Sequence, residues 1–250
     1  MKLQEVVAFL DGFLNVSEIQ DYPNALNGLQ LENDGRVRKV GAAVDASEPV
    51  LRAAVEAQVD LLIVHHGLFW GGLTRVTGPV YRKFHLAITA NLAVYSAHLP
   101  LDLHPAVGNN VLLAHRLGLT ELKPFFLERG ACIGVAAEVR LMRDELVRRL
   151  EQTLQRKVWM AAAGPVEIHR VGIVTGGAGA EVGKAAAEGV DTFITGEGPH
   201  HTFGLAEELR VNLIYGGHYA TETFGVCALG EMLSQKLGVP WVFIDRPSGL

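Results

Sequence analysis

The residues best suited to chemistry are six side chains that follow apolar, strand-like runs. They are His65, His66, His98, Asp102, His218 and Glu222. His98 and His218 each stand four positions before an acidic residue, whereas His65 and His66 are adjacent and are followed by Gly67. Imidazole and carboxylate groups are common ligands of divalent transition metals. The six are therefore candidate metal ligands, although a lone histidine is more often structural.

The adjacent pair allows two functional interpretations. Neighbouring residues of a regular strand point to opposite faces, so His65 and His66 cannot easily bind one ion from within a strand. Either each holds a different ion, or Gly67 permits a turn that directs both rings inward. The structural alternative is a strand that simply ends in two exposed histidines.

Four imidazoles and two carboxylates suit zinc, iron, manganese, cobalt or nickel better than calcium or magnesium, which prefer oxygen ligands. Six side chains shared between two divalent ions leave coordination positions open. Water bound there has its pKa lowered to roughly 7 and is a nucleophile at neutral pH. The ligand set thus predicts metal-assisted hydrolysis with a metal-bound water as nucleophile, and no general acid can be named.

Two further groups are weaker candidates. His200 and His201 follow the apolar run VDTFIT and are expected either to contact a substrate or to lie in a solvated loop. The glycine-rich segment at residues 176–179 opens a predicted helix, but it lacks the Lys-Ser/Thr of a Walker motif. A tight strand-to-helix turn explains that segment more simply than an anion site.

The elements that must position these residues follow a βαβ order. After an amphipathic helix at the N-terminus, residues 39–44 and 60–64 read as strands around a helix at residues 47–58, with Ser47 as its N-cap. Residues 171–175 and 191–195 read as strands around a helix at residues 179–188. The sequence therefore predicts the α/β class.

The two βαβ segments align without a gap at an offset of 131 residues, with seven of 28 positions identical. Further on, residues 93–102 align with residues 213–222 at an offset of 120, which places both His-x-x-x-acid pairs at the same position of the repeat. The carboxyl ends of strands in open α/β sheets face a shared crevice. We therefore expect two similar halves, residues 1–125 and 126–250, with the metal site in the cleft between them. Residues 124–164 have no counterpart and could form a small subdomain or connector.

Composition narrows the class of protein. Hydrophobic residues make up 49% and charged residues 20% of the 250 positions, as in ordinary globular proteins. A net charge of −5 with interspersed signs disfavours nucleic acid as a partner. Two isolated cysteines, the absence of a signal sequence and the lack of any apolar run of about 18 residues predict a cytoplasmic protein that is not inserted in a membrane.

Five sequence blocks resemble the Nif-three-like family, also called the type 2 GTP cyclohydrolase homologues. They are NALNGLQLEN, VHHGLFW, AHLPLDLHPAVGNN, TGEGPHH and GHYATETFGV. The resemblance implies a dinuclear metal centre on the six residues named first, two similar α/β halves, a homohexamer, and the short form of the family without a large central insert.

The leading hypothesis is a dinuclear metal-dependent hydrolase, cyclohydrolase-like by analogy only, that acts on a nucleotide-related or other anionic small molecule. The alternative is a metal-binding regulator or scaffold that works through protein–protein interaction. A third interpretation, in which the histidines only pack or cap, predicts no bound metal.

Overall fold

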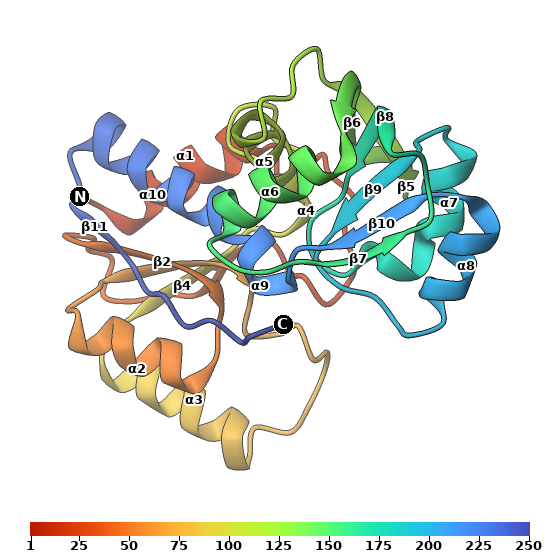
Figure 1. The fold of residues 1–250 in the computed structure, drawn as a ribbon. Helices are drawn as coiled ribbons and strands as arrows, with labels where there is room; N and C mark the ends of the chain where they lie inside the picture. The colour runs from red at the N-terminus through yellow and green to blue at the C-terminus, as the bar shows by residue number, and fades with distance from the viewer. The chain divides into compact units, whose positions relative to one another are not determined.

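The structure is a computed structural model that describes residues 1–250, and it is a mixed α/β fold with two sheets (Figure 1), as the sequence predicts. The chain forms two compact units. The first unit contains residues 1–101 and 225–246, and the second contains residues 102–224 and 247–250. The division expected near residue 125 falls inside strand β5 (Lys123–Glu128), and each unit takes residues from both parts of the chain.

The first unit is built on a five-stranded sheet with the order β1-β4-β3-β2-β11. Its strands are β1 (Gly28–Leu31), β2 (Val40–Asp45), β3 (Leu61–His66), β4 (Ala93–Ser96) and β11 (Trp241–Phe243). Only β1 runs antiparallel to its neighbour. The three central strands β2, β3 and β4 are almost wholly buried, which explains their continuous apolar sequences.

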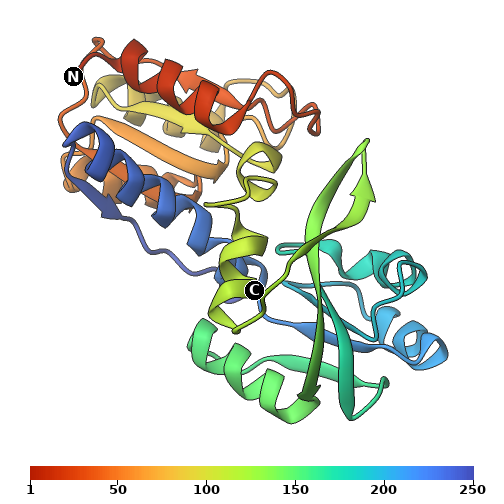
Figure 2. The same ribbon diagram turned by 90° about the horizontal axis from the view of Figure 1, so that it is seen from above.

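Helices cover both faces of this sheet (Figure 1, Figure 2). They are α1 (Leu3–Leu14), α2 (Glu48–Glu56), α3 (Gly78–Thr89) and α10 (Thr223–Leu237), with α2 and α3 on one face and α1 and α10 on the other. Helix α2 begins as predicted, because the Ser47 hydroxyl accepts a hydrogen bond from the Val50 N–H at 3.4 Å.

The second unit contains a six-stranded sheet with the order β5-β6-β8-β9-β10-β7. Besides β5, its strands are β6 (Ala131–Met142), β7 (Trp159–Ala162), β8 (Glu167–Ile173), β9 (Thr192–Thr195) and β10 (Asn212–Tyr215). Residues 124–164, for which the repeat offers no counterpart, supply β5, β6 and β7 and helix α6 (Arg143–Leu154). These residues extend the second sheet on both sides.

Two helix layers bury the faces of this second sheet. On one face, α5 (Asn109–Arg116) and α6 share a core with Ile168, Val171 and Ile173 of β8. On the other, α7 (Val182–Ala187) and α8 (Thr202–Leu209) pack over Phe193 and Leu213. Two short helices complete the unit, η1 (Ala178–Glu181) and α9 (His218–Thr221). A third short helix, α4 (Leu99–Asp102), stands at the boundary of the two units, because the first unit ends at Leu101 and the second begins at Asp102.

The internal duplication is visible in the topology. Strands β2, β3 and β4 are parallel neighbours in one sheet, and β8, β9 and β10 are parallel neighbours in the other. The pairing of Val40 with Leu61 recurs as Val171 with Thr192, which preserves the offset of 131 residues.

A packing contact is duplicated as well. A Cβ at Gly41 would approach Val59 Cγ1 at 3.0 Å, and a Cβ at Gly172 would approach Val190 Cγ1 at 3.0 Å. Both pairs obey the same offset of 131 residues, so the two copies share side-chain packing in addition to strand order.

The second block of the repeat contains one irregularity. The Ala97 N–H donates to Val64 O at 2.9 Å, and its structural counterpart is the bond from the Gly216 N–H to Thr195 O at 2.8 Å. The sequence alignment instead pairs Ala97 with Gly217. Gly217 is thus an extra residue between strand and histidine, and its φ of 100° is one that glycine adopts without strain.

None of the helices combines the length and the apolar character that crossing a bilayer requires.

Candidate metal centre

Three of the predicted ligands gather at the carboxyl ends of β3 and β4 in the first unit. They are His65, His66 and His98, called here the first histidine cluster. Their potential ligand atoms all lie within 4.8 Å of one another. The ring centroid of His65 lies 4.8 Å from those of both His66 and His98. The adjacent histidines therefore point to a common region, which favours the second of the two interpretations drawn from the sequence.

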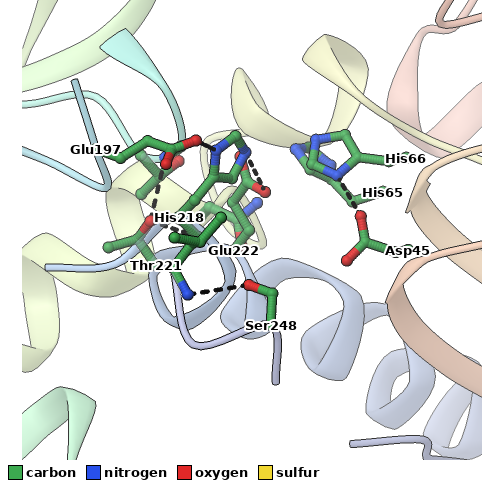
Figure 3. Close-up of polar contacts among 12 residues, drawn as sticks. Asp45, His65, His66, Glu197, His218, Thr221, Glu222 and Ser248 are labelled. Atoms are coloured by element: carbon green, nitrogen blue, oxygen red, sulfur yellow. Dashed lines mark hydrogen bonds and ion pairs between the residues drawn. The ribbon is translucent and has the colours of Figure 1, made fainter. Parts of the chain in front are cut away.

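Each ring of this cluster makes a hydrogen bond through Nδ1. His65 Nδ1 lies 2.8 Å from the carbonyl oxygen of Ala97, and His66 Nδ1 lies 2.9 Å from Asp45 Oδ1 (Figure 3). His98 Nδ1 lies 2.9 Å from Asp21 Oδ1. Carbonyl and carboxylate oxygens only accept, so Nδ1 carries the hydrogen in all three rings and Nε2 is the nitrogen that would bind a metal.

Among these acceptors, Asp21 receives hydrogen bonds from several donors. Besides His98, it accepts hydrogen bonds from the Asn27 side chain at 2.7 Å and from the Leu99 N–H at 2.9 Å. Burial opposes ionisation of this carboxyl, but the bonds and charge of His98 with the other two donors outweigh burial and lower the pKa of Asp21. A stable carboxylate is therefore fixed behind His98.

The second unit carries the duplicated pair, His218 and Glu222, at the two ends of α9. His218 Nε2 lies 3.2 Å from Glu222 Oε2, and His218 Nδ1 lies 2.7 Å from Glu197 Oε1 (Figure 3). Burial opposes protonation of this imidazole, but the hydrogen bonds and charges of Glu222 and Glu197 outweigh it and raise the pKa of His218 to about 9. In the metal-free protein a proton therefore occupies the nitrogen that would bind a metal.

A glycine turn makes room for Glu222. Gly176 has a φ of 75°, and a Cβ at this position would collide with the Glu222 carboxylate. The Gly176 N–H donates to Thr221 Oγ1 at 3.1 Å, and its carbonyl accepts from the Gly196 N–H at 2.8 Å. Residues 176–179 thus form the tight turn predicted as the simpler explanation, and the turn supports α9.

The remaining predicted ligand, Asp102, lies at the end of α4 and is buried. Its Oδ1 accepts a hydrogen bond from Asn109 Nδ2 at 2.8 Å. The neighbouring Asn110 accepts from the Thr175 N–H at 2.8 Å, and so ties the start of α5 to the segment that precedes Gly176. Both asparagines belong to the GNN end of a block quoted above.

The two residues predicted to contact a substrate are less firmly held than the predicted metal ligands. His200 and His201 are exposed at the start of α8, and their side chains make no hydrogen bond or ion pair. They follow Glu197, the acceptor of His218, by only a few positions. Their contact with a substrate stays a prediction.

The donor chemistry of these residues fits a transition metal. Histidine ligands in proteins usually donate their second ring N–H to a carboxylate or a backbone carbonyl, which fixes the tautomer and the ring orientation. All four histidines predicted as metal ligands make this hydrogen bond, three to carboxylates and one to a backbone carbonyl. Buried His and Glu groups of this kind could hold a metal ion.

Sequence reasoning missed three of the supporting carboxylates, Asp21, Asp45 and Glu197. Asp45 could have been found, because it ends β2 directly beside the end of β3 in a parallel sheet. Glu197 aligns with His66 in the repeat, which was a usable signal. Asp21 lies 77 positions from His98 in an irregular loop, and no periodic pattern marks it.

The raised pKa of His218 predicts a pH dependence of stability in the metal-free protein. The pKa is about 9 in the folded state against 6.5 ordinarily, so protonation of His218 stabilises the fold fully below about pH 6.5, and this contribution is lost as the pH rises through 9. Urea unfolding between pH 6 and 10 should show this loss in wild type and not in His218→Ala. Parallel profiles for the two proteins would contradict the assignment.

Removing the charge behind His98 should weaken metal binding. In Asp21→Asn the amide can present N–H groups to Nδ1, so zinc affinity should fall about 10- to 100-fold. Competition with a chromophoric chelator measures the affinity, and circular dichroism verifies the fold. Asp144→Asn is the control, because the Asp144 side chain is 90% exposed. Equal zinc affinity in Asp21→Asn and wild type would refute the role of Asp21.

Known proteins are similar to this chain in sequence and in fold over nearly their whole length. The chain is 42% identical to the GTP cyclohydrolase 1 type 2 homolog of Deinococcus radiodurans over 249 residues, covering 98% of this chain and 94% of the relative. It is 40% identical to the homolog of the same name from Archaeoglobus fulgidus over 250 residues, with both chains fully covered.

Solved structures agree. The crystal structure of TTHA1606 from Thermus thermophilus matches with a TM-score of 0.92 and 41% identity, with both chains fully covered. Reduced HcgD from Methanocaldococcus jannaschii matches with a TM-score of 0.88 and 27% identity over 98% of each chain. The model of the Duf34/NIF3 (NGG1p interacting factor 3) family matches residues 1–248. The resemblance seen in the sequence is thereby confirmed, and the chain belongs to the DUF34/NIF3 family.

Proposed function

We propose that this protein is a dinuclear metal-dependent hydrolase of a nucleotide-related or other anionic small molecule. One observation supports the proposal most strongly. In each of the four candidate ligand histidines, Nδ1 makes a hydrogen bond to an oxygen acceptor. Such pairing orients Nε2 for a metal and makes the ring a better ligand. The name of two similar proteins, GTP cyclohydrolase 1 type 2 homolog, also supports the proposal.

In this proposal the first histidine cluster and the His218–Glu222 pair, with Asp102, together hold two divalent ions. Zinc, iron, manganese, cobalt and nickel all suit imidazole with carboxylate. A divalent ion bound by these residues would lower the pKa of coordinated water to about 7 and so would supply a nucleophile at neutral pH.

The chain's own contribution is orientation and charge. Asp21 and Asp45 hold the rings of His98 and His66, and the Ala97 carbonyl holds His65. Glu222 is almost completely buried beside His218, and Asn109 fixes Asp102 from one side. Rigid supports of this kind keep a reactive centre in one geometry and spare the reaction the cost of reorganising it.

The family name contains the words "NGG1p interacting factor 3" and so favours a second function, regulation through protein–protein interaction. In this alternative the metal stabilises an assembly whose surface binds another protein. The family resemblance also leads us to propose a homohexamer. A regulator would keep its partner interface when His218 is replaced, whereas a hydrolase would lose its activity.

The experiment combines metal analysis with a substrate screen. Untagged protein loaded with each of the five metals should be assayed against nucleotides, phosphoesters and cyclic amides. We expect about two metal ions per chain in wild type, fewer in His98→Ala and His218→Ala, and hydrolysis lost in both variants. His115→Ala is the control, because His115 is exposed on α5. Inactivity of every metal form across the whole panel would count against an enzyme.

A further inference from the structure

Two large aromatic side chains stand beside the first histidine cluster and are exposed to solvent. The Trp70 ring centroid lies 4.9 Å from that of His66 and 4.6 Å from that of His98. The Tyr22 centroid lies 6.0 Å from that of His98. Trp70 is 38% exposed and Tyr22 is 39% exposed. Both therefore combine contact with predicted ligands and a surface open to a bound molecule.

The loops that carry these rings are held together by one side-chain amide. Gln30 of β1 donates to the carbonyls of Ala25 and Leu26 at 3.1 and 2.9 Å, in the loop that carries Tyr22. Its oxygen accepts from the Leu68 N–H at 2.6 Å, in the loop that carries Trp70. One side chain thus fixes both loops relative to β1.

Two further contacts restrict the loops. The position of a Cβ on Gly72 lies 3.4 Å from the Asn24 amide, so the segment just after Trp70 adjoins the segment just after Tyr22. The Tyr22 N–H donates to Asp21 Oδ1 at 2.6 Å, on the same carboxylate that orients His98. The aromatic residues are thereby tied to the framework of the histidine cluster.

The exposed positions of the Trp70 and Tyr22 rings are not explained by core packing alone. Covering the exposed part of Trp70 would add hydrophobic stabilisation, and the protein instead leaves 38% of this residue open beside the histidines. Positioned rings with an open surface are, by contrast, the usual means of binding flat ligand rings, since any heteroaromatic ring can stack on them.

We propose that Trp70 and Tyr22 form a ring-binding platform that selects substrates with a planar, nucleobase-sized heteroaromatic group. The proposal rests on the proposed function, since it concerns the substrate of the same site. The anionic part of the substrate faces the histidine cluster while the flat ring contacts Trp70 and Tyr22. The two are specificity-determining residues and not metal ligands.

The test compares two probes that differ by one nucleobase. Guanosine 5′-monophosphate and ribose 5-phosphate share the sugar and the phosphate, and only the first has a base. Equilibrium dialysis against zinc-loaded wild type should show the nucleotide binding at least about tenfold more tightly, a usual magnitude for one stacked base. Trp70→Leu should abolish this preference and Tyr22→Leu should reduce it, with ribose 5-phosphate affinity and zinc content unchanged.

Matched controls are available on the same chain. Trp159 and Tyr81 are likewise exposed, at 43% and 53%, and neither contacts a predicted ligand. Trp159→Leu and Tyr81→Leu should leave the preference intact. Equal binding of the two probes to wild type, or a preference that survives in Trp70→Leu, would overturn the proposal. Loss of zinc together with both probes in Trp70→Leu would also overturn it, because it would make Trp70 a support for the histidines.

The metal and the platform are measured separately. Binding of uncharged guanosine to the metal-free protein, followed by quenching of Trp70 fluorescence in a Trp159→Phe, Trp241→Phe background, reports the platform without a metal. Elemental analysis of the zinc-loaded samples reports the metal centre. Guanosine binding to the metal-free protein, combined with no retained zinc in the zinc-loaded samples, would contradict the proposed metal centre and support the platform. Retained zinc, combined with equal binding of the two probes, would contradict the platform and leave the metal centre intact.

Discussion

The orientation of the four candidate ligand histidines depends on one interaction, the hydrogen bond from histidine Nδ1 to a fixed oxygen acceptor. An imidazole has two chemically similar nitrogens and a free ring rotates about its bonds, so a ligand set needs a device that selects the nitrogen and the direction. Here Asp21, Asp45 and Glu197 provide it for three rings and the Ala97 carbonyl for the fourth. Asp21 in turn is held by several donors, so the order in the site extends outward into the fold.

Parallel strands that end together supply three of these acceptors, which are Asp45, Glu197 and the Ala97 carbonyl. Asp45 and His66 are cross-strand neighbours at the ends of β2 and β3, and His98 follows the end of β4 beside them. In the second unit, Glu197 and His218 follow the ends of β9 and β10 in the same way. A duplicated βαβ unit therefore brings acid and imidazole together twice, and the copies have since diverged: His66 in one copy aligns with Glu197 in the other.

The sequence predicted those features of the fold and the candidate site that depend on a local motif or on the internal repeat. The helix that starts after Ser47 follows from its capping residue, and the equivalence of His98 and His218 follows from the repeat. Long-range contacts were not predictable. The bonds of Asp21 to His98 and of Gln30 to Leu68 span 77 and 38 positions, and each has at least one partner in an irregular loop, where no periodic pattern exists. Residues 124–164 have no repeat partner, so their pairing on both sides of the second sheet left no signal in the alignment.

The central claim is that these histidines present Nε2 to a metal because their Nδ1 atoms are already bound. X-ray diffraction from zinc-soaked crystals, recorded at the zinc absorption edge, tests it most directly. We expect anomalous peaks at about 2.1 Å from Nε2 of His65, His66, His98 and His218, with every Nδ1 still on its oxygen acceptor. Peaks bonded to Nδ1, or occupied zinc positions elsewhere with none at these four rings, would contradict it.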